Sequence, residues 1–196
     1  MDKHLLNELY IVKAMSMNEI AEHLSISVHK VHYWLKKHSI NVRSYSEASY
    51  VKYNGLVDPF EINTSLTTDE ERLFGMGVGI YWGEGNKKSL NAVRVGNTDA
   101  NLIKVFVMFL IKICGVSPEK IRYGLQLFSD VEESDALSFW QYELNIERNQ
   151  IMPTISRIKS GKIGTYKVKN QFGVMTVYVF NRKLRDWLVD QLYVPR

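Results

Sequence analysis

The chain has 196 residues, of which 45% are apolar and 12% aromatic, enough for one medium domain or for a small module followed by a larger domain. No apolar run approaches the roughly 18 residues of a membrane span, and Met1 to His4 lead into amphipathic sequence instead of an apolar signal-peptide core, so we expect a cytoplasmic protein. The single cysteine, Cys114, excludes an intrachain disulfide and a cysteine-based zinc site, while the net charge of +4 is modest but uneven along the chain.

The start of the chain predicts three short helices. The first spans residues 4–13 on an apolar stripe. Ser16 and Glu19 have the spacing of a capping box, in which each side chain satisfies a backbone N–H of the other residue, and they open the second helix. Ser27 is the expected cap of a third helix over residues 28–38.

This arrangement resembles a helix-turn-helix of the resolvase and sigma-factor kind. In that motif a small residue, here Ala21, lets the two helices cross, and a buried aliphatic residue, here Val31, anchors the second of them. Ser25 stands where the usual turn glycine is found. The resemblance implies that residues 1–43 form a DNA-binding module whose third helix lies in the major groove.

The outward face of the third helix carries three lysines and no acid. The resemblance places the N-terminal residues of this face at base edges and its lysines at phosphates. The predicted DNA-binding residues are Ser27, Val28, His29, Lys30, His32, Tyr33, Lys36 and Lys37. A small helical module that binds another protein is the alternative. All five histidines lie in this module, but the carboxylate or thiolate partners of a metal site are not evident nearby, so no metal is expected here.

Residues 44–67 are rich in turn formers and are interpreted as a linker. A second capping box, Thr68 with Glu71, then predicts the start of a glycine-rich helix. Each interior glycine costs a helix about 0.5–1 kcal/mol relative to alanine, and close approach of a second helix backbone would compensate for that cost. The glycines predicted to form such a contact are Gly75, Gly77 and Gly79.

Strands and helices alternate beyond this helix. A short strand at 92–97 is predicted to form a hairpin with 86–89, and its Arg94 is a candidate DNA-binding residue. The other predicted elements, in chain order, are a helix at 100–114, a strand at 121–128, a helix at 132–144, a hairpin of 164–169 with 174–180, and a helix at 182–192.

The last part of the chain is strongly basic. Between Arg148 and Arg185 there are nine Lys or Arg residues and no Asp or Glu, whereas 130–147 is acidic. A positive face of this kind is typical of proteins that bind a phosphate backbone, and an ordinary solvated surface is the alternative. The candidate phosphate contacts around the predicted hairpin are Lys162, Lys167 and Lys169.

The order of these elements, led by a glycine-punctuated helix that ends in an acid and a glycine, resembles the LAGLIDADG homing-endonuclease family. The motif that gives the family its name falls on residues 77–85. Small residues match at Val78 and Gly79, an aliphatic residue matches at Ile80, and the terminal small-acid-glycine triplet matches at 83–85. Trp82 stands where the first acid is usually found. The resemblance covers about residues 68–192, through this one motif and through the order of the elements.

The resemblance implies an α+β domain over 68–196, of the αββαββα type with a mixed or antiparallel sheet that straddles the DNA major groove. It also implies a Mg²⁺-dependent, site-specific endonuclease acting on double-stranded DNA. One motif per chain implies a homodimer in which the motif helices of two chains meet. Glu84 of each chain is then a metal ligand, the Gly83 carbonyl is a second ligand, and Lys87 or Lys88 assists catalysis.

Other interpretations of the glycine-rich helix remain. A nucleotide-binding loop is disfavoured because the glycine spacing is not G-x-G-x-x-G, no P-loop Gly-Lys-Ser/Thr occurs and no strand precedes the segment. A packing helix that ends in an acid by chance is a second alternative. A third is a protein that keeps the family fold and DNA binding without cleavage, and so acts as a sequence-specific transcription regulator.

Overall fold

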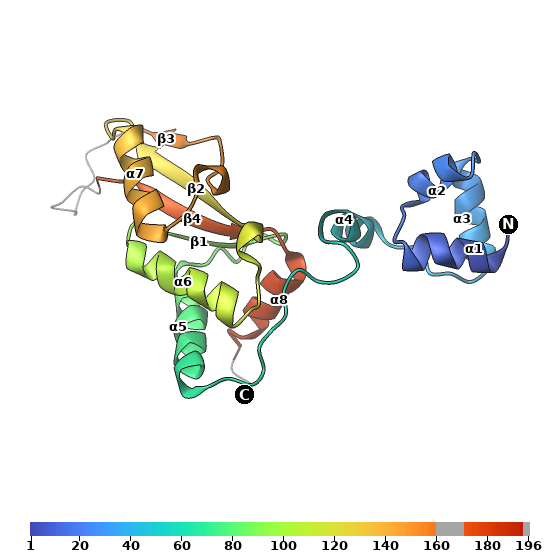
Figure 1. Ribbon diagram of the computed structural model, residues 1–196, viewed down its shortest axis with the longest axis horizontal. Coiled ribbons are helices and arrows are strands. Elements are labelled where there is room, and N and C mark those ends of the chain that lie inside the picture. The colour runs from blue at the N-terminus through green and yellow to red at the C-terminus, as the bar shows by residue number, and fades with distance from the viewer. Residues whose placement is uncertain (160–170, 194–196) are drawn as a thin grey trace. The chain divides into compact units, whose positions relative to one another are not determined.

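The computed structural model describes residues 1–159 and 171–193. The chain divides into two compact units, Met1–Asp58 and Pro59–Arg196, each with its own hydrophobic core (Figure 1). Helices and a four-stranded mixed sheet make up the described residues, so the predicted α+β class is confirmed. None of the helices described is long and apolar enough to span a membrane. The predicted strand at 164–169 and the candidate contacts Lys162, Lys167 and Lys169 lie outside the described residues.

Three helical segments build the core of the first unit. α1 (Lys3–Asn7) continues into a π-helical turn, Glu8–Val12, and is followed by α2 (Met17–His23) and α3 (Val28–Lys37). Burial of large aliphatic and aromatic side chains stabilises this small unit. The buried residues are Leu6, Leu9, Tyr10, Ile20, Ala21, Val31, Leu35 and Ile40.

The caps of α2 and α3 follow the sequence prediction. The main-chain N–H of Glu19 donates to Ser16 Oγ at 3.2 Å and that of Ser16 donates to the Glu19 carboxylate at 2.7 Å, which confirms the capping box. Ser27 Oγ accepts from the N–H of Lys30 at 3.3 Å. Ser25, in the turn between the helices, has φ of +53°, a left-handed conformation that costs a residue with a Cβ about 1 kcal/mol and that glycine adopts freely.

The segment predicted as a linker, 44–67, contains a further helix, α4 (Tyr45–Asn54). Ser44 and Glu47 form a capping box at its start. No residue of α4 is buried, so this helix is stabilised by its cap and by local bonds and not by a core. The Tyr50 hydroxyl donates to the Asp58 carboxylate at 2.6 Å, a contact that ties α4 to the end of the first unit.

Arg43, which follows α3, bonds back to the end of the first helical segment. Its guanidinium donates to the main-chain carbonyls of Tyr10, Ala14 (3.1 Å) and Met15 (3.3 Å). The same group lies over the ring of Tyr10, 4.2 Å from the ring centroid, and the Arg43 main-chain N–H donates to the Tyr10 hydroxyl at 2.8 Å. These bonds satisfy carbonyls that the end of the first helical segment leaves free.

We expect Arg43→Ala to destabilise the first unit by about 2 kcal/mol, because several charge-assisted bonds and one cation–π contact are lost together. Urea titration of the full chain, followed by hydrogen exchange in peptides from residues 1–43, measures the effect. Lys52→Ala is the matched control, since this cation is exposed and its ammonium lies 5.7 Å from the centroid of the Tyr53 ring. Equal protection in the two variants would contradict the role assigned to Arg43.

α5 (Thr68–Glu84) is the longest helix in the described part of the second unit. Its cap is Thr67. The Thr67 hydroxyl accepts from the main-chain N–H of Glu70, and the main-chain N–H of Thr67 donates to the Glu70 carboxylate at 2.9 Å. The capping box predicted at Thr68 and Glu71 was therefore one residue too late. The bonds from Thr67 lower the pKa of Glu70, which places a stable negative charge at the positive end of the helix dipole.

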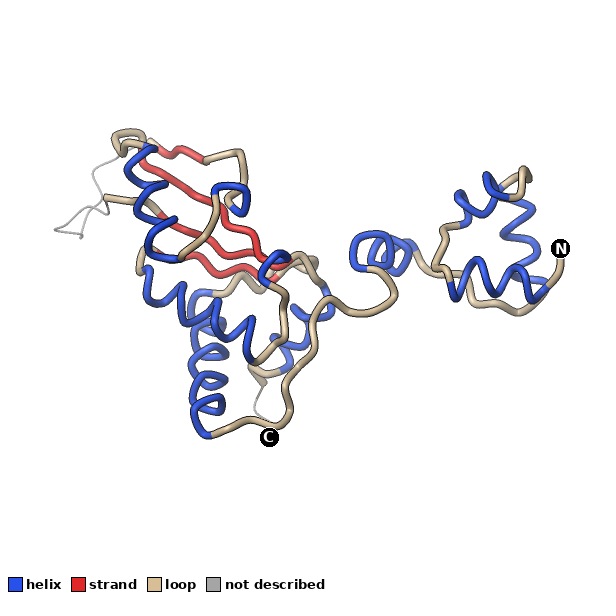
Figure 2. Tube along the Cα trace, viewed as in Figure 1, coloured by secondary structure: helices blue, strands red, loops and turns tan. Residues whose placement is uncertain are grey.

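One mixed sheet forms the centre of the second unit (Figure 2). Its strands are β1 (Val93–Asn97), β2 (Ile121–Phe128), β3 (Ser156–Ile158) and β4 (Val174–Val179), in the spatial order β1-β4-β2-β3. β4 is antiparallel to both of its neighbours and β3 is parallel to β2. The strand predicted at 86–89 is wrong: a single bridge joins Gly85 to Val95, and β1 pairs with β4 instead.

Helices α6 (Ala100–Lys112) and α7 (Glu133–Leu144) lie on one face of this sheet (Figure 1). Every second residue of β2 and β4 is buried and points toward these helices, and the residues between them are half-buried and point to the other face of the sheet. α5 packs against α6 and β1, and α8 (Arg182–Asp190) joins them through an edge contact of Trp187 with Phe74, with ring centroids 6.4 Å apart. Short 3₁₀ turns at Pro118–Lys120 and Arg148–Gln150 complete the elements described.

Candidate functional site

The outward face of α3 is accessible and positively charged. Among the DNA-binding residues predicted at positions 27–37, His32 is half-buried and the others are exposed, namely Ser27, Val28, His29, Lys30, Tyr33, Lys36 and Lys37. The Lys37 ammonium stands 4.7 Å from the ring centroid of Trp34 and 5.8 Å from that of Tyr33. His38, at the end of α3, stacks on Trp34 and bonds to the Met1 carbonyl at 2.9 Å. The aromatic rings of Tyr33 and Trp34 therefore lie beneath one of the three lysines of this face, Lys37.

The glycines of α5 fall into two groups. A Cβ on Gly77 would overlap the ring of Phe109 in α6, and one on Gly85 would overlap Tyr81. These two glycines are explained by packing within the chain. A Cβ added to Gly75, Gly79 or Gly83 would meet nothing within 4 Å, so no contact among the described residues accounts for these three glycines.

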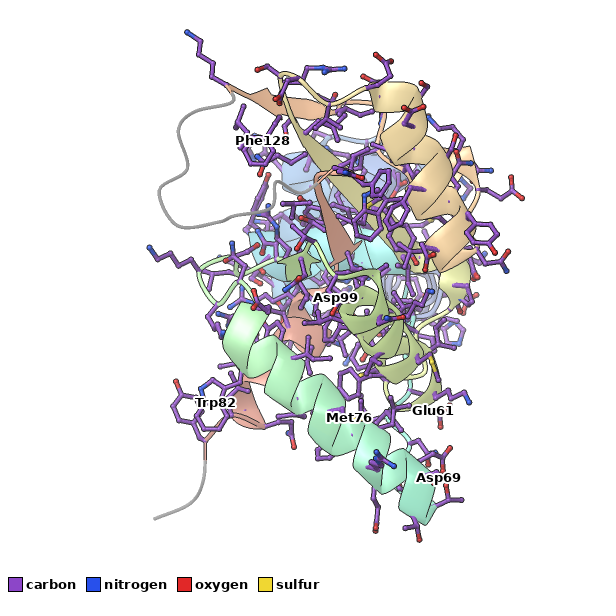
Figure 3. All side chains as sticks on the ribbon, turned by 90° about the vertical axis from the view of Figure 1, so that its left-hand side faces the viewer. Glu61, Asp69, Met76, Trp82, Asp99 and Phe128 are labelled. Atoms are coloured by element: carbon purple, nitrogen blue, oxygen red, sulfur yellow. The ribbon has the colours of Figure 1, made fainter. Side chains whose placement is uncertain are left out.

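This grouping corrects part of the predicted contact between chains. Gly77 is buried beneath Phe109 and belongs to the packing of α5 on α6, not to an outer surface. Gly75 and Gly79 are exposed at a spacing of four residues, on the outer side of the helix. Met76 and Trp82 are exposed on the same helix, and Trp82 projects outward beside its last turns (Figure 3). The outer side of α5 is therefore glycine-rich and partly apolar.

Glu84 is the last residue of α5, and its side chain is exposed. A helix C-terminus carries about half a negative charge, and the last turn of α5 itself contains no basic residue. A carboxylate at this end therefore favours a bound cation. The described residues contain no group of three or more His, Cys, Asp or Glu side chains that would hold a metal. Among the predicted metal ligands, Glu84 supplies a carboxylate, which is a hard oxygen ligand of the kind that Mg²⁺ binds.

The two predicted catalytic lysines differ in their surroundings. The Lys87 ammonium donates to the main-chain carbonyl of Trp82 and stands 5.7 Å from the centroid of the Tyr81 ring, so it offsets part of the negative charge at the end of α5. Lys88 is exposed, and its main-chain N–H donates to the Asn86 side chain at 3.0 Å. Of the two lysines, Lys88 is the exposed one, four residues after Glu84 in the sequence.

Arg185 of α8 holds the loop that follows Glu84. Its guanidinium donates to the Lys87 carbonyl and, at 2.9 Å, to the Asp186 carboxylate. Tyr81 is fully buried close by; burial raises the pKa of its phenol, and the hydroxyl has no hydrogen-bond partner among the residues described. The contact between Arg185 and Lys87 joins residues 98 positions apart, and no local signal in the sequence indicated it.

A second basic surface lies on the face of the sheet that α6 and α7 do not cover. The strand register places Tyr178 between Arg94 and Arg122 in one row across β1, β4 and β2. The Arg94 guanidinium lies over the Tyr178 ring, with its carbon 4.8 Å from the centroid, and donates to the Tyr178 hydroxyl at 3.2 Å. At the far end of the same face, Phe128 lies on the side of the sheet away from α7 (Figure 3).

Sequence reasoning identified Arg94 and missed Tyr178 and Arg122. The sequence contained a signal for both residues. Buried and half-buried positions alternate along β2 and β4, and the half-buried positions, which include Arg122 and Tyr178, lie on the face opposite the core. The register that makes the three residues neighbours depends on the central position of β4, which alternation within single strands does not reveal.

Comparison with models of protein families, with curated proteins and with solved structures finds no match to this chain.

Proposed function

We propose that the protein is a homodimeric, Mg²⁺-dependent endonuclease that binds duplex DNA, with a helix-turn-helix in its first unit that adds affinity or specificity. The observation that carries the proposal is the outer side of α5, where no contact among the described residues accounts for Gly75, Gly79 and Gly83, on a helix that ends at an exposed Glu84. A second copy of α5 laid against this side explains the three glycines, because small residues let helix backbones approach closely.

If the two α5 helices pack in parallel, their last residues, Glu84 of each chain, lie at the same end of the helix pair. Two carboxylates and a phosphate oxygen are the kind of ligand set that Mg²⁺ takes in phosphodiester chemistry. Bound Mg²⁺ would polarise the phosphate and lower the pKa of the attacking water. In this assignment Glu84 holds the cation, Lys87 balances the helix end, and the exposed Lys88 stabilises negative charge on the phosphate. Arg185 keeps the loop in place.

Two surfaces support DNA as the substrate. α3 presents exposed lysines and no acid, the pattern expected of a helix that reads the major groove and contacts phosphates. Arg94 and Arg122 add positive charge on the open face of the sheet. The four described strands contain no Asp or Glu, so no carboxylate within them opposes a phosphate there.

The DNA-binding role of α3 is tested by reversing its charge. We expect the triple variant Lys30→Glu, Lys36→Glu and Lys37→Glu to weaken binding to all duplexes alike and to lower the slope of log K against log salt by about three, one unit for each phosphate contact. Fluorescence anisotropy of a labelled duplex over a range of salt concentrations measures both quantities.

The matched control reverses three exposed lysines of the first unit that lie outside α3, namely Lys3, Lys13 and Lys52. The control variant has the same net charge as the α3 variant, so it should lose only the part of the DNA affinity that depends on overall charge. If the two triple variants lose affinity and salt slope equally, α3 does not contact DNA, and a module that binds another protein becomes the better assignment.

A non-cleaving, sequence-specific regulator is the second candidate. Two observations favour it: Trp82 replaces the first acid of the motif, and the connection after Glu84 contains no strand. The shorter strand surface would read fewer base pairs. Both candidates require salt-dependent duplex binding, and they differ in whether bound DNA is cut.

A further inference from the structure

An aromatic pair lies at one end of the open sheet face. Tyr178 and Phe180 are two residues apart, on and just beyond β4, and therefore point to the same side. Their rings are nearly parallel, at 19°, with centroids 5.8 Å apart. Phe180 is the outer ring of the pair and is 56% exposed, although an apolar ring of this size is normally covered.

The pair is held in place from both sides. Arg94 of β1 covers the ring of Tyr178 and bonds to its hydroxyl. On the β2 side, a Cβ on Gly124 would come within 2.8 Å of Tyr178 Cε2, so this glycine leaves the room that the ring occupies. Tyr178 is thus fixed by its neighbours, and Phe180, stacked on it, presents a preset aromatic surface.

Two arginines lie beside the pair. Arg94 and Arg122 occupy the positions on either side of Tyr178. Arg122 donates to the main-chain carbonyls of Glu119 at 2.6 Å and Ile121 at 2.9 Å, which satisfies hydrogen bonds without neutralising its charge. The next row of the face is formed by Gly96, Thr176 and Gly124, so little side-chain bulk stands beside the rings.

Exposed rings flanked by arginines match the chemistry of unpaired nucleotides. A base stacks on an aromatic ring through its flat face, and neighbouring cations bind the phosphates. In a duplex, the faces of the bases are buried in the stack and only their edges are presented in the grooves. A ring such as that of Phe180 therefore gains little from paired DNA and much from a base that is not paired.

We propose that Tyr178 and Phe180, with Arg94 and Arg122, form a stacking site for an unpaired nucleotide, so that this face binds single-stranded nucleic acid. The inference rests on the nucleic-acid-binding part of the proposed function and goes beyond its duplex substrate. Phe180 supplies the ring on which the base stacks. Tyr178 supports that ring, and the arginines hold the adjacent phosphates.

The experiment compares two labelled 12-mers, oligo-dT and an abasic strand of the same length and charge, for binding to the full chain by anisotropy. We expect the protein to bind oligo-dT more tightly than the abasic strand. Phe180→Ala should weaken oligo-dT binding about tenfold or more and leave abasic binding unchanged, since stacking of one base contributes that much. Phe180→Trp should retain the preference. Tyr142→Ala is the matched control, because this ring is 85% exposed on α7, away from the open face.

Three results would overturn the inference: equal binding of the two strands by the unaltered protein, an unchanged preference in Phe180→Ala, or an equal loss in Tyr142→Ala. A duplex measured in parallel separates this inference from the proposed function. If duplex binding is absent while binding of oligo-dT depends on Phe180, the endonuclease assignment fails and the stacking site stands. If duplex binding follows the α3 lysines and the base preference is absent, the stacking site fails alone.

Discussion

Glu84→Gln is expected to reduce Mg²⁺-dependent cleavage of a bound duplex by about 1,000-fold, equivalent to about 4 kcal/mol of transition-state stabilisation. The amide keeps the shape of the side chain but removes the charge that attracts the cation. Duplex affinity measured without Mg²⁺ should be unchanged, because α3 and the open sheet face supply the phosphate contacts. Cleavage is followed on a labelled duplex under single-turnover conditions.

Loss of folding does not explain this expected result. A negative charge at a helix C-terminus is unfavourable, so the amide at position 84 should leave α5 intact or slightly more stable. Glu71→Gln makes the same chemical change at the exposed other end of α5 and should cut normally. Full cleavage by Glu84→Gln would show that this carboxylate is not the metal ligand.

Gly77→Ala is expected to destabilise the second unit by about 3 kcal/mol. The added methyl group would overlap the Phe109 ring close to its attachment, where the side chain has little freedom to move aside. This cost exceeds the roughly 1 kcal/mol that alanine gains over glycine in a helix. Chemical denaturation of the full chain, followed by the fluorescence of Trp187 and the other tryptophans, measures the change.

Gly79→Ala is the matched comparison and should act in the opposite direction on a single chain. Its methyl group meets open space, so the helix gains up to about 1 kcal/mol. Between two chains the same methyl group would separate the α5 helices. Sedimentation at several concentrations should therefore show weaker association for Gly79→Ala and unchanged association for Glu71→Gln. Equal association of Gly79→Ala and the unaltered chain would remove the argument for an α5 interface.

Local chemistry predicted much of this molecule. The capping pair Ser16 and Glu19, the cap at Ser27 and the alternating strand at 121–128 all follow from interactions between residues a few positions apart, and the structure contains each of them. The box at the start of α5 was displaced by one residue because Thr67 and Thr68 are followed three positions later by Glu70 and Glu71, two equivalent choices.

Long-range packing accounts for what local chemistry did not predict. β4 comes last along the chain yet lies between β1 and β2, and no short-range pattern specifies that insertion. Gly77 and Gly79 are alike as residues, but the helical period places Gly77 four residues before the buried Tyr81 and so on the inner face. That spacing was a usable signal. The hydrogen bonds from Arg43 to Tyr10 and from Arg185 to Lys87 join residues that are far apart in the sequence, so no local pattern predicted them.

The most direct test of the proposed function is to select duplexes bound by the full chain from a random library and then to add Mg²⁺. We expect the selected duplexes to bind in a salt-dependent manner and to be cut within the bound site, and Glu84→Gln to bind the same duplexes without cutting them. Selected duplexes that stay intact in Mg²⁺ would contradict cleavage and favour the regulator, and failure to enrich any duplex would contradict DNA binding itself.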